Sequence, residues 1–250
     1  MSIFERIFKS AVRDALVRHI ESGIMKQLSV GLLFLFLLLG GQAAAQLNLK
    51  IGYSLSVLDP QNLNETVKAF NEANPWYDDK LKDLNLFNGL LIGFRNKWEG
   101  VALEFTWSTK FASQRIEGIR PDDNKSVFRE NFYRIQSFSF GPEFYFGNIG
   151  IGATLDASDV TIRTLKSQEP NEIPVLDEFT LSTHLFASYH IKTGDFMSLC
   201  FRPFVQLPFD RINTFSFEEE LFPGTTNDSA DYDDNFLNFG LMIIFYNGNQ

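Results

Sequence analysis

Hydrophobic and polar residues alternate strictly along most of the chain from Gln46 onward. In segment 46–57 the large apolar side chains fall on odd positions, whereas Asn, Lys, Gly and Ser fall on even positions. The same period of two recurs in segments 101–111, 179–191, 197–209 and 237–245, and less regularly in 86–95, 128–146 and 149–164. A period of two gives a β-strand one apolar and one polar face. The sequence therefore predicts eight strands, with a bulge near Ser137, where the pattern changes phase.

The predicted connections between these strands alternate between short and long. Tight turns are expected at 96–99, 147–148 and 192–195, and long loops at 58–85, 112–127, 165–178 and 210–234. An even number of antiparallel strands with this alternation is typical of an outer-membrane barrel, with short turns in the periplasm and long loops outside the cell. The predicted fold class is therefore all-β: an eight-stranded antiparallel transmembrane β-barrel, an up-and-down meander spanning residues 46–250.

The residue types on the two faces separate a membrane barrel from a soluble one. A soluble eight-stranded barrel of the lipocalin kind would carry many charges on its outer face. Here one face is large and apolar, and the other is mostly Ser, Thr, Gly, Asn and Ala, which suits a narrow, filled lumen. Aromatic residues are also expected to form two girdles, near the short turns (Trp98, Tyr145 and Tyr189) and near the long loops (Trp107, Phe111 and Phe209).

The segment before the first strand has the anatomy of a cleavable signal peptide. Residues 25–45 contain Lys26, an apolar stretch at 28–39 and the small residues of 43–45 ahead of Gln46. A single N-terminal anchor helix is the alternative. Residues 1–24 carry only a weak helical stripe, and we interpret them as an over-called start before Met25, with a cytoplasmic amphipathic segment as the alternative. The signal peptide predicts that the chain is exported through the periplasm to the outer membrane.

Composition excludes several classes of function. The net charge of −9 disfavours binding to nucleic acid. The single cysteine, Cys200, excludes a disulfide framework. With only three histidines beside it, the sequence also offers little basis for a zinc centre. No cofactor is expected.

The face predicted to point inward carries six charged residues that we expect to form a polar network: Lys50, Arg95, Glu104, Glu143, Asp156 and Arg202. In a narrow lumen such charges need to pair with one another. A structural plug is the favoured interpretation. The alternative is a gate whose ion pairs exchange partners and admit water or small ions.

Two histidines on the same face, His184 and His190, lie near Ser182 and Ser188. A serine hydrolase acting on lipid is one interpretation of this pattern. The sequence shows no clear acid to orient either histidine, and both rings point away from the lipid. We therefore predict no enzymatic activity.

Two of the long loops contain candidate interaction residues. In the first loop, Asn62 or Asn64 is expected to cap a short helix with Leu63, Val67 and Phe70 on one face, serving as a lid or as a partner-docking helix. The last loop is acidic, with divalent-cation binding as a weak alternative to a solvated surface. Its apolar residues, including Phe215, Phe217 and Phe222, are expected to form a cap or a partner contact, and the alternation of Phe215 with Phe217 suggests an extended hairpin.

The layout resembles the small outer-membrane β-barrels of Gram-negative bacteria, the OmpX-like and OmpA-transmembrane-like proteins. The segments that carry the resemblance are IGYSLSV, GVALEFTW, SFSFGPEFYFG, IGIGATLD, RPFVQLPF and FGLMIIFY, within residues 46–246. It implies outer-membrane lipid and lipopolysaccharide as partners. It also implies a role in envelope structure, or as an accessory in an envelope complex for secretion or assembly. A small gated channel and a lipid-modifying enzyme are the alternatives.

Overall fold

The computed structural model describes residues 46–247, except for residues 168, 195 and 225–231. The signal peptide predicted at 25–45 and the over-called start predicted at 1–24 lie outside the described residues. Among the helices within this range, none has the length and apolar character needed to cross a membrane.

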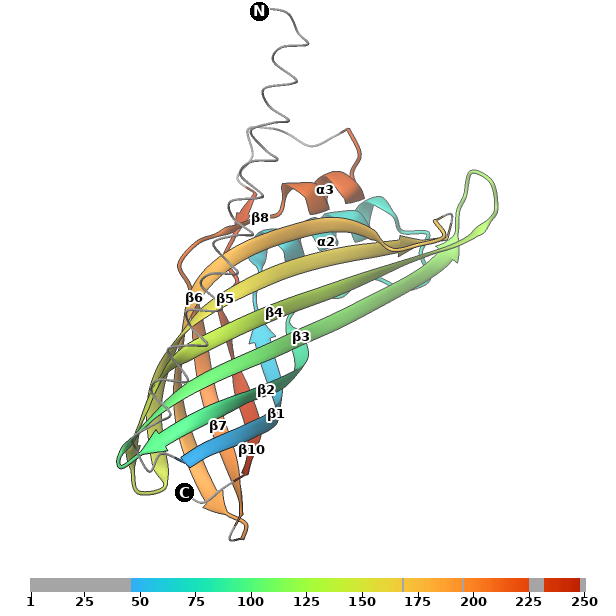
Figure 1. Cartoon of the computed structure of the whole chain (residues 1–250). Coiled ribbons are helices and arrows are strands. Elements are labelled where there is room, and N and C mark those ends of the chain that lie inside the picture. Colours follow the sequence, from blue (N-terminus) through green and yellow to red (C-terminus); the bar gives the residue numbers. More distant parts are fainter. Residues whose placement is uncertain (1–45, 168, 195, 225–231, 248–250) are drawn as a thin grey trace, which may run out of the picture. The chain divides into compact units, whose positions relative to one another are not determined.

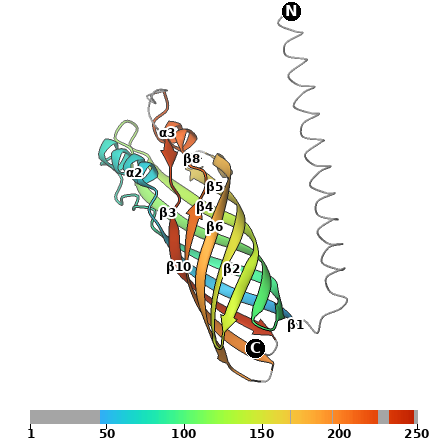
Figure 2. The same ribbon diagram turned by 90° about the vertical axis from the view of Figure 1, so that its left-hand side faces the viewer.

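Eight strands close into an antiparallel barrel (Figures 1 and 2). Around the barrel they are β1 (Gln46–Leu58), β2 (Leu86–Trp98), β3 (Val101–Ile119), β4 (Ser126–Phe146), β5 (Ile149–Lys166), β6 (Ile173–Lys192), β7 (Met197–Pro208) and β10 (Asn238–Asn247). The first strand closes the ring by pairing with the last, with Lys50 opposite Tyr246. Closure gives every strand a neighbour on both sides for its backbone hydrogen bonds. Hydrocarbon cannot supply such hydrogen-bond partners to a strand in a membrane. The predicted fold class is confirmed.

The outer face of the barrel is apolar at most positions. Its large hydrophobic side chains, such as Ile51, Phe140 and Phe245, are 44–54% exposed, and their neighbours in sequence point into the lumen. Apolar side chains facing outward around a polar interior are the arrangement that lipid requires. The prediction of a membrane barrel rather than a soluble one is therefore confirmed.

Two of the tight turns depend on glycine. Gly100 between β2 and β3 has φ 76°, and Gly147 between β4 and β5 has φ 66°. Glycine adopts this left-handed conformation without the steric cost that a Cβ would bring. These turns let the strands reverse within two residues at this end of the barrel.

Strands β3 to β6 are much longer than a membrane crossing needs. They have 18–21 residues, compared with 10–13 in the other barrel strands. A crossing takes about 9–11 residues. The excess continues past the rim as a four-stranded sheet, which we call the β3–β6 extension (residues 112–119, 126–135, 160–166 and 173–180; Figure 1).

The extension corrects two of the predicted loops. Segments 112–127 and 165–178 are largely strand, and the actual connections are 120–125 and 167–172. Above the membrane the outer face of the sheet meets water, so charged residues such as Arg115 and Glu117 replace the lipid-facing apolar ones. Their polarity resembles that of a loop although the backbone pairing continues.

The bulge predicted near Ser137 is also wrong. The register of β4 with β3 is continuous through Ser137, and the irregularity lies instead between β5 and β6 at Ile162/Arg163. The apparent change of phase has another cause: Tyr133 and Ile135 point inward, and they are apolar because they contribute to a hydrophobic core above the membrane.

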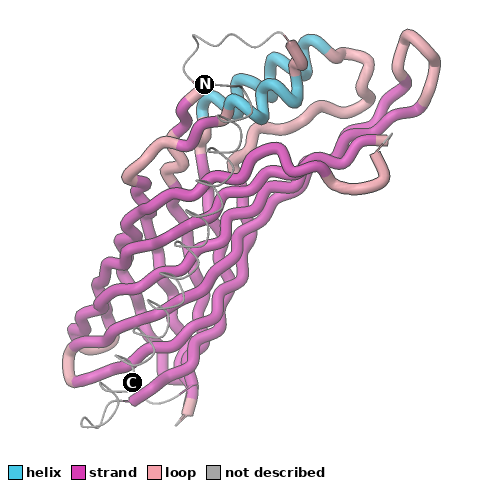
Figure 3. Tube along the Cα trace, turned by 45° about the horizontal axis from the view of Figure 1, so that its top comes forward, coloured by secondary structure: helices cyan, strands magenta, loops and turns pink. Residues whose placement is uncertain are grey.

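That core lies beneath the cap, which we define as α2 (Gln61–Ala73), α3 (Phe215–Leu221), β8 (Ile212–Asn213) and β9 (Asp233–Asp234). The cap sits at the end of the barrel opposite the tight turns (Figure 3). Its side chains pack against the inward side of the extension in one cluster, comprising Leu58, Leu63, Val67, Phe70, Leu81, Leu84, Phe87, Ile116, Tyr133, Ile135, Val160, Ile162, Leu176, Ile212, Phe217, Leu221 and Phe236. Apolar burial therefore holds the cap on the barrel mouth.

A helix occupies the position where a hairpin was predicted around Phe215. Phe217 and Leu221 are four residues apart, so one helical face buries both, and the glutamates between them favour a helix. Glu220 accepts a hydrogen bond from Arg129 Nη2 of β4 at 2.8 Å and pairs with Lys166 of β5. Part of the acidic run thus ties the helix to the extension.

Helix α2 begins two residues earlier than the predicted caps allow. Its N-cap residue is Pro60, which offers no side-chain hydrogen bond. The cap comes from Asp234 of β9, whose Oδ2 accepts a hydrogen bond from the Leu63 N–H at 2.9 Å. Burial raises the pKa of Asp234 even though backbone N–H groups donate to it. Asn64, predicted as a possible cap, instead accepts a bond from the Leu84 N–H at 2.6 Å.

Candidate functional site

The centre of the lumen holds a buried ion-pair network, which we call the ionic layer (Lys50, Arg95, Glu104, Glu143 and Arg202). Glu104 accepts hydrogen bonds from Lys50 Nζ and Arg202 Nη1, both at 2.6 Å. A further bond from Arg202 Nη2 to Glu143 Oε2, at 3.0 Å, links the two carboxylates. All five residues are at most 3% exposed. Five of the six residues predicted to form the polar network are thus brought together.

Arg95 joins the ionic layer through two tyrosines. Its Nη1 donates to the Tyr145 hydroxyl at 2.9 Å, and its guanidinium lies 3.9 Å from the centre of the Tyr246 ring. Tyr145 was predicted to belong to a membrane girdle, which is wrong, because its hydroxyl turns inward and donates to Glu143. The hydroxyl of Tyr246 donates to Glu104 at 2.8 Å. Tyr145 follows the inward phase of β4, two residues after Glu143, and inside the lumen its hydroxyl finds the hydrogen-bond partners that lipid could not supply.

Asp156, the sixth predicted residue, belongs to a separate cluster closer to the cap. Its carboxylate accepts hydrogen bonds from Thr154 at 2.6 Å and from Gln206 Nε2 at 3.2 Å, and lies 3.4 Å from His184 Nδ1. Lys110 donates to Gln206 Oε1 at 3.0 Å. Lys110 and Gln206 were not predicted as part of the network, although both follow the inward phase of their strands.

Inward-facing glycines make room for this packing. A Cβ on Gly150 would lie 2.3 Å from both Glu143 Oε1 and Ser188 Oγ, and one on Gly152 would lie 2.3 Å from the Phe186 ring. These distances are too short for a Cβ, so a larger residue at either position would have to displace Glu143 and Ser188 or the Phe186 ring. The cavity that remains between the ionic layer and the Asp156 cluster is about 20 Å³. Since a water needs at least about 10–15 Å³, this is room for about one water.

The serine and histidine residues of the lumen do not form a catalytic triad. Ser188 Oγ lies 3.0 Å from His190 Nε2, and Glu143 lies 3.3 Å from the same nitrogen. A triad needs the acid on one ring nitrogen and the nucleophile on the other. Carboxylates do lie beside both histidines, contrary to the sequence-based expectation that none would.

The predicted loop-interaction residues are mostly inside the cap. Leu63, Val67 and Phe217 are 0% exposed and Phe70 is 5% exposed, whereas Phe222 is partly buried. Phe215 packs edge-on against Tyr232 at 5.1 Å between ring centres. This burial favours the lid interpretation over the docking helix for α2.

The acidic loop offers no metal site that can be described. Over the described residues there is no group of three or more Asp, Glu, His or Cys side chains placed to hold a metal ion. Asp228 and Asp231 of the predicted acidic run lie outside the described residues.

Comparisons with known proteins concern the fold only. Neither the protein-family models nor the curated proteins match this sequence. Among solved structures, the chain is similar to Ail, the attachment invasion locus protein of Yersinia pestis, in complex with the heparin analogue sucrose octasulfate (9% identity, 82% of this chain and 99% of that chain, TM-score 0.46). It is also similar to a second crystal structure of Ail (10% identity, 82% and 99%, TM-score 0.43) and to Neisserial surface protein A (8% identity, 83% and 100%, TM-score 0.40). With its closed ring of eight antiparallel strands, apolar outer face and polar lumen, the chain has the fold of the small outer-membrane β-barrels.

Proposed function

We propose that the protein is a non-conducting outer-membrane barrel that presents the β3–β6 extension and the cap at the cell surface. It acts there in envelope structure, or as an interaction component of an envelope complex. The observation that carries the proposal is the double closure of the lumen, by the ionic layer within the membrane and by the apolar core under the cap.

The two closures make a small gated channel the weaker candidate. Solute passage would require the cap to leave its core and the buried ion pairs to separate. Removing one partner from a buried ion pair costs about 3–5 kcal/mol, so an open state that leaves several charges unpaired is rarely populated. The remaining cavity of about 20 Å³ is also too small for a solute.

A lipid-modifying enzyme is also the weaker candidate. The Ser188 hydroxyl and His190 ring are 2% and 1% exposed inside the lumen, on the opposite side of the wall from the lipid. A lipid substrate has no route to them. The function therefore resides in the surface above the membrane, where the chain has placed its additional strands and helices.

Conductance in planar bilayers tests the closed lumen. The refolded chain, inserted as the full barrel, should show no steady openings in 1 M KCl across the usual range of voltages. Insertion is checked independently by resistance of the strands to protease in matched vesicles. Steady single-channel openings from verified inserted protein would contradict the proposal and favour the gated channel.

A further inference from the structure

The outer faces of β4 and β5 change from apolar to polar at one level. On β4 the outward residues from Phe146 to Phe138 are aromatic or proline, and Gln136 and Arg134 follow. At about 3.4 Å per residue and a tilt of about 40°, that apolar stretch rises about 21 Å, close to the apolar band of about 25 Å in such barrels. On β5 the same change occurs between Ala157 and Asp159. Arg134 therefore lies at the level of the headgroups of the outer leaflet.

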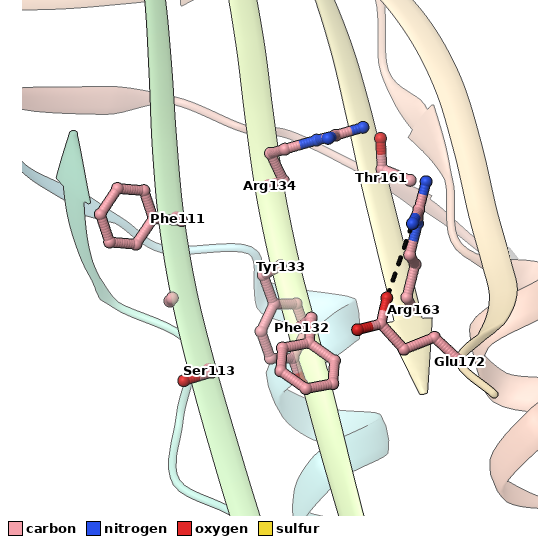
Figure 4. A pocket seen from close by; sticks show the side chains of 9 residues that line it. Phe111, Ser113, Phe132, Tyr133, Arg134, Thr161, Arg163 and Glu172 are labelled. Atoms are coloured by element: carbon pink, nitrogen blue, oxygen red, sulfur yellow. Dashed lines mark ion pairs between the residues drawn. The ribbon is translucent and has the colours of Figure 1, made fainter. Parts of the chain in front are cut away.

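A hollow of about 280 Å³ opens on the outside of the extension at this level (Figure 4). Its lining includes Phe111, Ser113, Phe132, Arg134, Thr161 and Arg163. In the register of the sheet, Arg134 lies between Phe111 on β3 and Thr161 on β5. The hollow thus combines aromatic faces, hydroxyl groups, two guanidinium groups and the Glu172 carboxylate directly above the lipid-facing surface.

The charges in the hollow are not balanced. Arg163 pairs with Glu172 at 3.5 Å, and both side chains are nearly half exposed. Arg134 is exposed, and within the described part of the chain no carboxylate lies within ion-pair distance of it. Asp177 lies opposite Thr161 on the next strand, so the cationic end of the hollow is the Arg134 end.

A second hollow extends the first across β3. It has a volume of about 570 Å³, is lined by residues 81–86 and by Gln114, and shares Ala112 and Ser113 with the first hollow. Of the two shared residues, Ser113 is exposed on the outer face of β3, whereas Ala112 packs against the core beneath the cap. We call the two hollows together the rim groove, and their volumes of about 280 and 570 Å³ leave room for a group larger than one phosphate.

We propose that the rim groove binds the phosphorylated sugar headgroup of an outer-leaflet glycolipid, with Arg134 donating to a phosphate. A guanidinium gives phosphate two parallel hydrogen bonds, and such charge-assisted bonds are the strong ones. The acyl chains of the same lipid would continue down the apolar face of β3 and β4, which on β4 begins at Phe138, below Gln136. Continuity with the lipid-facing surface therefore identifies a lipid, rather than a soluble anion, as the occupant.

This inference goes beyond the proposed function and does not depend on the closed lumen. A conducting barrel could still bind lipid in the rim groove, and a closed one could fail to bind it. The conductance result and the lipid result are therefore independent of each other.

The test is binding of bis-phosphorylated lipid A to the detergent-solubilised full chain, measured by native mass spectrometry. Arg134→Glu should weaken the affinity by at least about tenfold, since it replaces a charge-assisted bond with repulsion. Wild-type protein should bind lipid A that lacks both phosphates as weakly as the variant binds the phosphorylated lipid. Arg134 is exposed and unpaired within the described residues, so the variant is expected to fold, which retained heat-modifiable gel mobility would verify.

Arg115→Glu is the matched control. Arg115 lies on the same outer face, but it is already paired with Glu117 at 2.8 Å and lies above the groove. Its reversal should change lipid A affinity by less than about twofold. Equal binding of phosphorylated lipid A by wild type and Arg134→Glu would overturn the proposal. So would equal affinity of wild type for the deacylated, phosphorylated disaccharide, because the occupant would then not be a lipid.

Discussion

Replacing Glu104 with glutamine should destabilise the barrel by about 3–5 kcal/mol. The glutamine amide keeps the shape of the side chain but loses the charge that Lys50 Nζ and Arg202 Nη1 approach to 2.6 Å. Both cations are then left in the lumen without their main partner, and an unpaired buried charge costs this much. Equilibrium unfolding in urea, with the protein in lipid vesicles, measures the loss.

Two further variants test whether the loss of stability comes from the lost buried charge or from substitution of a glutamate in general. Glu117→Gln removes an ion pair with Arg115 whose side chains are 49% and 58% exposed, and it should cost less than about 1 kcal/mol. Adding Lys50→Met to Glu104→Gln removes one of the orphaned cations and should recover part of the stability. If Glu104→Gln unfolded within 1 kcal/mol of wild type, the ionic layer would not contribute to stability as described.

Replacing Phe217 with alanine should loosen the cap while leaving the barrel closed. Phe217 is 0% exposed in the core between α3 and the extension, with its ring centre 6.4 Å from that of Tyr133. Truncation of a buried phenylalanine costs about 3–5 kcal/mol. Protection of α2 amides against hydrogen exchange should fall by about two to four orders of magnitude.

Amides of β1 and β10 should keep their protection in the Phe217→Ala variant, because the core under the cap is separate from the ionic layer. The matched control is Phe215→Ala, two residues away in the same helix, whose ring is only partly buried. Its effect on α2 should be much smaller. Unchanged α2 protection in Phe217→Ala would show that this core does not hold the cap.

The barrel could be predicted from sequence because one physical rule governs its whole wall. A side chain on a strand faces either lipid or lumen, so alternation alone placed Lys50, Glu104 and Arg202 on the inside. The same rule indicated that the inward charges need partners. It did not indicate which residues pair, since Glu104 meets Arg202 from 98 positions away along the chain.

The sequence-based prediction failed where the rule changes above the membrane. Tyr133 and Ile135 are apolar and point inward because a core, rather than a polar lumen, lies behind them. Interpreted with the rule for the membrane, they suggested a change of phase. The upper part of β3 likewise suggested a loop, because its outward residues meet water. A switch of polarity on both faces at the same position is the signal that could have revealed the extension.

Contacts between distant segments could not be predicted from the sequence at all. The cap of α2 comes from Asp234, 171 positions after the Leu63 amide that it binds, and no local pattern marks it. Alternation places Tyr145 in the lumen with Glu143, but its contact with Arg95, 50 positions away along the chain, has no local signal. The rim groove also needs three strands in register before its residues become neighbours.

In the placement that we propose, the apolar outer face meets lipid and the β3–β6 extension lies outside the cell. Labelling of single cysteines with a membrane-impermeant maleimide tests it directly, in a Cys200→Ser background. In intact cells, Asp122→Cys at the tip of the extension should label, whereas Phe140→Cys on the outer face and Asn148→Cys in a tight turn should not. Permeabilising the outer membrane should expose Asn148→Cys alone. Labelling of Phe140→Cys by the aqueous reagent, or of Asn148→Cys before permeabilisation, would contradict the account.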